Sequence, residues 1–169
     1  AYDSFPIFNL SGNNRSTKNG GTDYNSSSLT NLTPENFETI YNLMTATNNR
    51  DERDSIIEND CDTLLTQDGS DYFKARRILL SERLPGGQLN DVNIYRDIVM
   101  PMKWSYLSGG GWYVGKKQHP DWEFHDVQKP DIRFYRNEDT RGYNATIDAM
   151  WGVKIGNWRA WHKANGSYA

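Results

Sequence analysis

The side chains best suited to catalysis in this sequence are one cysteine, Cys61, and three histidines, His119, His125 and His162. Cys61 could act as a nucleophile if a histidine took its proton. The residues around Cys61 argue against this chemistry, because like-signed neighbours raise the pKa of a thiol. These acidic neighbours are Glu58, Asp60 and Asp62. We therefore expect Cys61 to be an ordinary buried residue, and a cysteine hydrolase is kept as an alternative function.

A second candidate site is the polar run His119–Asp126, which holds two histidines and three carboxylates in eight positions. Such side chains suit several divalent metals. The spacing fits neither a helical HExxH motif nor a calcium-binding loop, and Pro120 favours an irregular backbone. We interpret the run as a polar surface loop in which Trp122 and Phe124 point inward. We expect no metal and no other cofactor.

The composition narrows the class of protein. The 169 residues carry 19 basic and 22 acidic side chains, a net charge of −3, so the whole chain lacks the basic footprint of a nucleic-acid-binding protein. No apolar run approaches the roughly 18 residues that a membrane span needs. A single cysteine excludes an internal disulfide. Aromatic residues make up 13% of the chain, which is too many for a disordered protein and suggests large buried or contact surfaces.

The first half of the sequence predicts two helices. Residues 11–31 hold few large apolar side chains and predict a long exposed loop. Thr33 and Pro34 then begin a helix as its N-cap and first residue. An apolar stripe at i, i+3, i+4 and i+7 predicts that residues 33–48 form one amphipathic helix along a sheet. The stripe consists of Phe37, Ile40, Tyr41 and Met44.

Three further elements are predicted between this helix and the middle of the chain. The apolar run Cys61–Leu65 predicts a strand. A second helix follows the turn at residues 68–71, carries the Arg76-Arg77 pair and ends at about Arg83, before a Pro-Gly-Gly sequence. Ile94–Met100 predicts a strand, which Pro101 limits to an edge or an end of a sheet.

The second half of the sequence changes to a period of two. Alternation predicts a strand at Trp112–Lys117, another that includes residues 132–136, and a long one at Ala145–Ile155 with one buried face. Glu138–Gly142 predicts the turn that joins the last two. Trp158–His162 predicts a short final strand. Two helices followed by a strand-rich second half indicate an α+β fold.

The order of these elements resembles one protein family. It consists of a capped helix (LTPENFETIYNLM), a strand (DTLL), a second helix (SDYFKARRILLSERL), a polar loop (QLNDVN), a strand ending at Pro101, the strand WYVGKK and a long charged hairpin arm. Two short motifs accompany it, Asn90-Asp91-Val92-Asn93 in the loop and Asn157-Trp158-Arg159 near the end. Over roughly residues 25–165 the chain is similar to the C-terminal part of tailed-phage major capsid proteins of the Hong Kong ninety-seven fold.

The resemblance implies two domains. A peripheral domain would contain the spine helix and the C-terminal strands, in residues 32–56 and 131–169, and an axial domain would take residues 57–130. Residues 1–31 would be an extended arm or loop. Family members also carry an N-terminal arm and an extended loop before the spine helix, so the resemblance implies that a second chain or segment supplies them.

The function that the resemblance implies is structural and not enzymatic. Copies of the chain would assemble into pentamers and hexamers of an icosahedral capsid in the virion, enclosing double-stranded DNA without sequence-specific binding and without a membrane. Charges at subunit contacts would set register more than affinity. The expected contact residues are Arg76, Arg77, Asn90, Asp91, Asn93, Glu138, Asp139 and Arg141. The alternative to this reading, besides the hydrolase, is a carbohydrate- or surface-binding module that uses exposed aromatic side chains.

Overall fold

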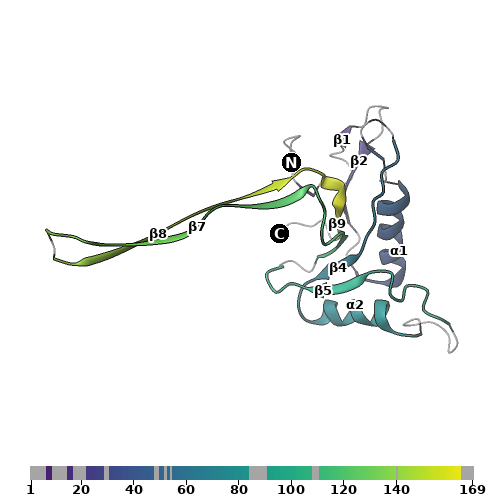
Figure 1. The fold of residues 1–169 in the computed structure, drawn as a ribbon. Coiled ribbons are helices and arrows are strands. Elements are labelled where there is room, and N and C mark those ends of the chain that lie inside the picture. Colours follow the sequence, from purple (N-terminus) through teal and green to yellow (C-terminus); the bar gives the residue numbers. More distant parts are fainter. Residues whose placement is uncertain are drawn as a thin grey trace. The chain divides into compact units, whose positions relative to one another are not determined.

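The fold mixes helices and strands, as the α+β prediction expected (Figure 1). The computed structural model describes residues 7–8, 15–16, 22–28, 31–47, 50–51, 53, 55–83, 91–107, 111–139 and 141–164. These residues divide into two compact units. The core unit takes the described residues up to 119 together with 158–164, and the hairpin unit takes residues 120–157.

Helix α1 (Pro34–Asn42) begins at the predicted residue. The side chain of Thr33 accepts a hydrogen bond from the backbone N–H of Asn36 at 3.2 Å, and Pro34 occupies the first turn. The helix continues as the π-helix η1 (Leu43–Thr47), so the predicted single helix consists of two kinds of turn. Of its apolar stripe, Phe37, Ile40 and Met44 are buried, and Tyr41 packs partly buried against the same core.

The core unit is built on a five-stranded sheet in the order β3-β9-β6-β4-β5. The strands are β3 (Ser26–Ser27), β4 (Thr63–Thr66), β5 (Met100–Lys103), β6 (Trp112–Gly115) and β9 (Trp161–Ala164). The pairs β4–β6 and β6–β9 are antiparallel, whereas β4–β5 and β3–β9 are parallel. Pro101 lies in β5 at one edge of the sheet, which its missing N–H requires.

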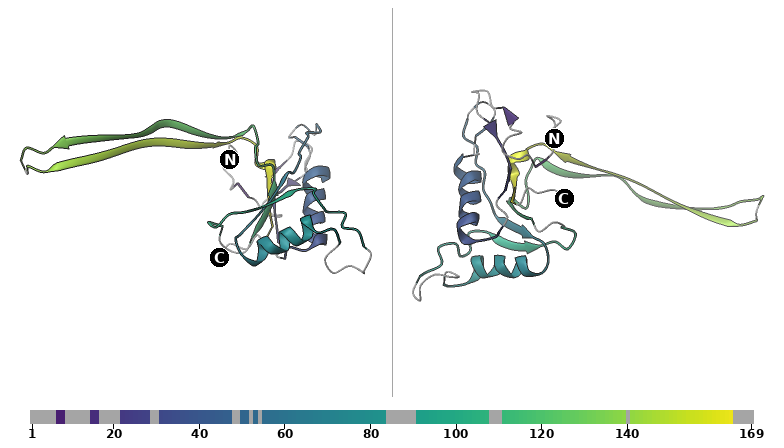
Figure 2. Two further views of the ribbon diagram at one scale, coloured as in Figure 1. Left: turned by 60° about the horizontal axis from the view of Figure 1, so that its bottom comes forward. Right: turned by 180° about the vertical axis from the view of Figure 1, so that it is seen from behind.

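One face of this sheet carries the core. Leu64, Val114 and His162 lie side by side across β4, β6 and β9, and all three are buried. Helix α2 (Ser70–Leu80) adds Ala75, Ile78 and Leu79 to the apolar cluster that also contains Phe37 and Ile40. Figure 2 shows α2 along β4 and β5 from two further sides. Both helices therefore cover sheet residues that the strands present on one side.

Residues 11–31 differ from the predicted exposed loop. Arg15–Ser16 (β1) pairs with Thr22–Asp23 (β2), and β3 joins the main sheet. Asn25 is buried, because its side-chain amide donates to the carbonyls of Ile7, at 2.8 Å, and Trp158, at 3.0 Å. Hydrogen bonds to distant parts of the chain, which no apolar pattern signals, draw this polar segment inward.

Other element boundaries also differ from the prediction. Residues 94–99 form turns and bends instead of a strand, with Asp97 in the left-handed region at φ 60°. Helix α2 ends at Leu80 and not near Arg83. The last predicted strand begins as the 3₁₀ helix η2 (Trp158–Ala160), and only β9 is extended.

The hairpin unit consists of β7 (Trp122–Arg136) and β8 (Tyr143–Ile155), paired antiparallel. β7 runs through residues 130 and 131, where the predicted boundary between axial and peripheral domains falls. The assignment of segments to those domains stays a prediction. The strand also replaces the loop expected over His119–Asp126, since β7 takes in Trp122–Asp126.

Candidate assembly surface

The β7–β8 hairpin presents one apolar face along its whole length. Side chains of directly opposed residues point to the same side of a ladder, and the pairs of this face follow one another from base to tip. They are Trp122–Ile155, Phe124–Val153, Asp126–Trp151, Ile132–Ile147, Phe134–Ala145 and Arg136–Tyr143. On β8 the face consists of every odd residue from Tyr143 to Ile155, and all seven are apolar or aromatic. The period of two in the sequence thus becomes one continuous surface.

Two register shifts keep this face continuous on β7. Between Asp126 and Gln128, and again between Gln128 and Asp131, β7 has one residue more than β8. Each extra residue is a β-bulge, and beyond it the odd and even residues of β7 exchange the faces to which their side chains point. Two exchanges cancel, so Ile132 returns to the side that Phe124 occupies. Because there are two bulges and not one, the apolar residues of the two strands still lie on the same face at both ends of the hairpin.

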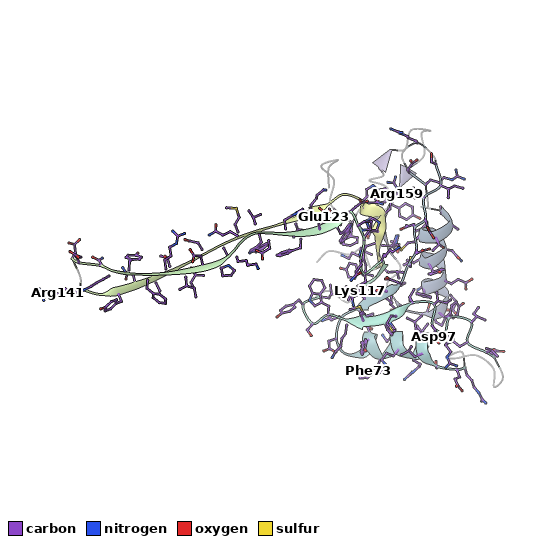
Figure 3. All side chains as sticks on the ribbon, in the orientation of Figure 1. Phe73, Asp97, Lys117, Glu123, Arg141 and Arg159 are labelled. Carbon is purple, nitrogen blue, oxygen red and sulfur yellow. The ribbon has the colours of Figure 1, made fainter. Side chains whose placement is uncertain are left out.

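The apolar face is exposed, which corrects the prediction of a buried face. Phe134 is 76% exposed and Trp151 is 67% exposed, and Phe124, predicted to point inward, is exposed as well. Trp122 is partly buried, and its indole N–H donates to the carbonyl of Asn157 at 2.7 Å. Figure 3 shows side chains standing out from the ribbon between the labelled Glu123 and Arg141. The alternation correctly predicted an apolar face on the strand. Alternation alone cannot show whether residues of the same chain or of another chain cover that face.

The opposite face of the hairpin is mostly polar. Near its base the carboxylate of Glu123 lies 3.1 Å from Nε2 of His125 and 3.6 Å from the ammonium of Lys154. Farther along, the guanidinium of Arg133 pairs with Asp131 at 2.8 Å. All these side chains are exposed, and exposed ion pairs contribute little to stability. The two faces therefore differ sharply in polarity, which is typical of a strand pair covered on one side.

The tip of the hairpin carries three of the predicted contact residues. Glu138, Asp139 and Arg141 are exposed in the turn. The side chain of Asn137 accepts from the N–H of Asp139 at 3.0 Å, and the N–H of Asn137 donates to Gly142 at 2.8 Å, so the turn is internally bonded. A role of these charged side chains in subunit contacts stays a prediction.

The remaining predicted contact residues lie in the core unit. Arg76 and Arg77 are exposed on α2, and Asp91 is exposed after it. Asn90 lies outside the described residues. Asn93 is instead 4% exposed, and its amide donates to the carbonyl of Ile78, at 2.6 Å. It also donates to Ser81, at 2.9 Å, and thereby caps the end of α2. In this chain Asn93 is a structural residue, a role that its loop sequence did not reveal.

The structure places Cys61, the candidate nucleophile, in the apolar core. Cys61 is buried, with its Sγ 3.6 Å from the sulfur of Met44. Burial, followed by the negative charges of Asp60 and Asp62, raises the pKa of this thiol to about 12. It lines a cavity of about 250 Å³ together with Asp62 and residues 97–100, and none of these is a histidine. The thiol is therefore protonated at neutral pH.

The residues of the candidate metal site, His119–Asp126, all lie in the described part of the chain and do not form a metal-binding group. His125 and Asp126 are neighbours on β7 and point to opposite sides of the strand, since successive side chains alternate. Among the described residues, no group of three or more histidine, cysteine or acidic side chains could hold a metal ion. In the same part of the chain, no helix is long and apolar enough to cross a membrane.

Comparison with known proteins gives no family. No protein-family model matches the sequence, and no curated protein sequence matches it significantly. The function of the chain must therefore be argued from its own residues, of which the uncovered face of the hairpin is the most informative.

Proposed function

We propose that this chain is a structural subunit of an icosahedral viral capsid, resident in the virion, that assembles with copies of itself into pentamers and hexamers. The order of its elements supports this proposal. A capped helix with a buried stripe, a strand, a second helix, an edge strand and a long hairpin follow one another as in the capsid family that the sequence resembles. A second chain or segment would supply the arm and extended loop that family members carry.

The observation that carries the proposal is the exposed apolar face of the hairpin. A two-stranded hairpin is at best marginally stable in water by itself. Large exposed apolar patches on soluble proteins mark interaction sites. Tyr143, Phe134 and Trp151 each expose well over half of their surface on the same face. A subunit that completes its layers only through neighbouring polypeptides accounts for this surface.

The charge of the chain supports a shell around DNA. Tight binding to phosphates requires many lysine and arginine contacts, whereas this chain has a net charge of −3. An inner wall without strong phosphate contacts encloses DNA without holding it at particular sequences. The role is structural and not catalytic, and the protonated, buried thiol of Cys61 agrees with that role.

The proposal is tested by the assembly state of the purified full chain. We expect sedimentation at micromolar concentration to show large assemblies, and negative-stain images to show closed shells, alone or with a co-purifying polypeptide. Phe134→Asp places a charge on the apolar face and should abolish closed shells. Thr146→Asp, on the polar face of the facing strand, is the matched control and should leave them intact. A cooperative, well-folded monomer that never associates would overturn the proposal.

A carbohydrate- or surface-binding module is the second candidate, favoured by one observation. The rings of Phe124 and Trp151 stack with centroids 6.1 Å apart and are exposed. Flat aromatic platforms of this kind suit the faces of sugar rings. A monomer whose tryptophan fluorescence responds to glycans, with the response lost in Trp151→Ala, would favour this function over assembly.

A further inference from the structure

The apolar face of β8 has a pattern that reads the same in both directions. From residue 143 to residue 151, its side chains are Tyr143, Ala145, Ile147, Ala149 and Trp151. Two small residues flank the central Ile147, and a large aromatic residue follows on each side. A twofold axis through Ile147 would therefore set Ala145 of one copy near Ala149 of another, and Tyr143 near Trp151. Twofold interfaces need this self-complementarity, because both partners use the same patch.

The charges on this face obey the same symmetry. Arg136 lies directly opposite Tyr143, and Asp126 lies directly opposite Trp151. The axis that pairs Tyr143 with Trp151 therefore brings Arg136 of each copy to Asp126 of the other, twice per dimer. Within the described part of the chain, neither side chain takes part in an ion pair. Along the ladder the two are separated by the eight-residue span from Tyr143 to Trp151, about 27 Å, which is too far to pair within one chain.

The side-chain sizes also allow two hairpins to pack. Phe134 lies beside Ala145 on the face. In the antiparallel arrangement, β8 of one copy lies over β8 of the other, so the small Ala145 faces the small Ala149 and leaves room beside them for the ring of Phe134. Sheets packed face to face lie about 10 Å apart and fill the space by placing large side chains over small ones. At the centre, Ile147 faces Ile147 of the other copy, and Ile132, which lies opposite Ile147 in each hairpin, faces Ile132.

The area of the face is of the order that a stable interface needs. Three aromatic side chains lie between the two charged ends of the contact, Phe134, Tyr143 and Trp151, and each is more than 60% exposed. Fully buried aromatic side chains bury about 150–250 Å² each, so these three alone offer roughly 400 Å². Ile132 and Ile147 add to that, and stable interfaces bury about 800 Å² per partner.

From these observations we propose that the apolar face of the β7–β8 hairpin packs against the same face of a second copy, antiparallel and centred on Ile147. The inference deepens the proposed function, because it rests on self-association and names the surface and the geometry through which two subunits join. The proposed contact between two hairpins has twofold symmetry, and one Arg136–Asp126 pair lies at each of its two ends.

Charge exchange on the full chain tests the geometry. Asp126→Arg and Arg136→Asp each replace two attractive pairs by two repulsive ones. Each single variant should weaken self-association at least about tenfold, measured by sedimentation equilibrium. The double variant Asp126→Arg/Arg136→Asp should restore it to within about threefold of the original chain. A mixture of the two single variants should form mixed dimers, because each then offers what the other lacks.

Two controls keep the test specific. Asp148→Arg makes the same change on the polar face, opposite Asp131, and should leave the dissociation constant unchanged. Far-ultraviolet circular dichroism of each variant should match the original, which excludes unfolding as the cause. If the single variants associate normally, or if the double variant fails to recover while folded, the proposed contact is wrong.

A cross-link tests the position of the axis. Ile147→Cys, in a Cys61→Ala background, should be joined between two copies by a short bifunctional thiol reagent, because the two Ile147 positions face each other at the axis with their backbones about 10 Å apart, too far for a direct disulfide. Tyr135→Cys, on the polar face of β7, should not. Shells that form without this cross-link and tolerate the charge exchange would overturn the hairpin contact but leave the capsid proposal standing. Cross-linked dimers that never close into shells would retain the contact and remove the capsid proposal.

Discussion

The core unit and the hairpin unit follow the same sequence rule and reach opposite degrees of burial. Both place apolar side chains at the spacing of their secondary structure. In the core unit this spacing leaves Phe37 1% exposed, under the sheet and a second helix, whereas in the hairpin unit it leaves Phe134 76% exposed. The comparison teaches that periodicity determines which face of an element is apolar, while burial depends on whether the same chain supplies a second layer.

The two units also differ in what holds them together. The core unit combines apolar packing with buried hydrogen bonds, such as those of Asn25 and Asn93. The hairpin unit relies on its backbone ladder and on exposed ion pairs, which contribute at most about 1 kcal/mol each. We therefore expect the hairpin to gain most of its stability from association and the core unit to have its own.

The largest expected effect comes from truncating the same side chain in the two units. Phe37→Ala removes a buried ring that packs edge to face on Tyr95, with centroids 6.1 Å apart, and should cost about 3–5 kcal/mol. Phe134→Ala removes an exposed ring and should change the stability of the dilute chain by about 0.5 kcal/mol or less. Urea unfolding at submicromolar concentration gives both values. Equal costs would mean that the hairpin face is covered within the chain.

The sequence predicted the elements best where one local pattern decides the structure. The N-cap at Thr33, the stripe of α1 and the two strands of the hairpin all follow from residues close together in the chain. It failed where distant groups compete with the local pattern. Residues 94–99 looked like a strand, but Asn93 bonds the end of α2 and the backbone of Tyr95, and this turns the chain.

The candidate site could be predicted only in part for the same reason. Alternation marked the apolar residues of β8, and the turn at Glu138–Gly142 was placed correctly. The two β-bulges, which set Asp126 opposite Trp151 and Arg136 opposite Tyr143, depend on the pairing of two strands. No property of either strand alone reveals that pairing. Polar loop sequence likewise favoured Asn93 as a contact residue, although its amide is used inside the fold.

A smaller effect should appear in the pH dependence of the core unit. Burial lowers the pKa of His162 to about 4, and neither ring nitrogen has a hydrogen-bond partner among the described residues. The unfolded chain takes up this proton near pH 6.5, and the folded chain does so only near pH 4. The contribution of His162 to stability should thus fall by up to about 3 kcal/mol as the pH drops from about 6.5 to about 4, and this contribution changes no further below pH 4.

Two histidine variants separate this effect from the rest of the titration. His162→Phe should flatten the stability profile between pH 6.5 and 4, because the other described groups whose pKa folding lowers, Asp51 and Lys163, have ordinary pKa values outside this range. His125→Phe, on the exposed hairpin, should leave the slope unchanged. Thermal unfolding in a series of buffers measures both. If stability still depended on pH in this range in His162→Phe, other groups would cause the pH dependence. The core unit and the hairpin unit would then not differ in this property.

The smallest effect on the fold, and the sharpest contrast between the units, should come from thiol reactivity. With a pKa near 12, Cys61 has a thiolate fraction of about 10⁻⁴ at pH 8, and burial also blocks access of a reagent. A disulfide reagent should modify no thiol in the native chain and one in denaturant, and Cys61→Ala should leave self-association unchanged. If a reagent modified Cys61 rapidly in the native chain, or if Cys61→Ala lost an activity, the result would instead support the cysteine-hydrolase alternative.

The hairpin supplies the matching thiol. In the Cys61→Ala background, the thiol of the Ile147→Cys variant lies on an exposed strand and should react at once in dilute solution. Its reactivity should then fall as concentration rises, because association covers the face, while that of Tyr135→Cys on the polar face stays constant. An Ile147→Cys variant whose thiol is unreactive even at high dilution would place a cover over the face within the single chain. In that case the apolar residues of both units would be buried within the chain, and the two units would not differ in burial.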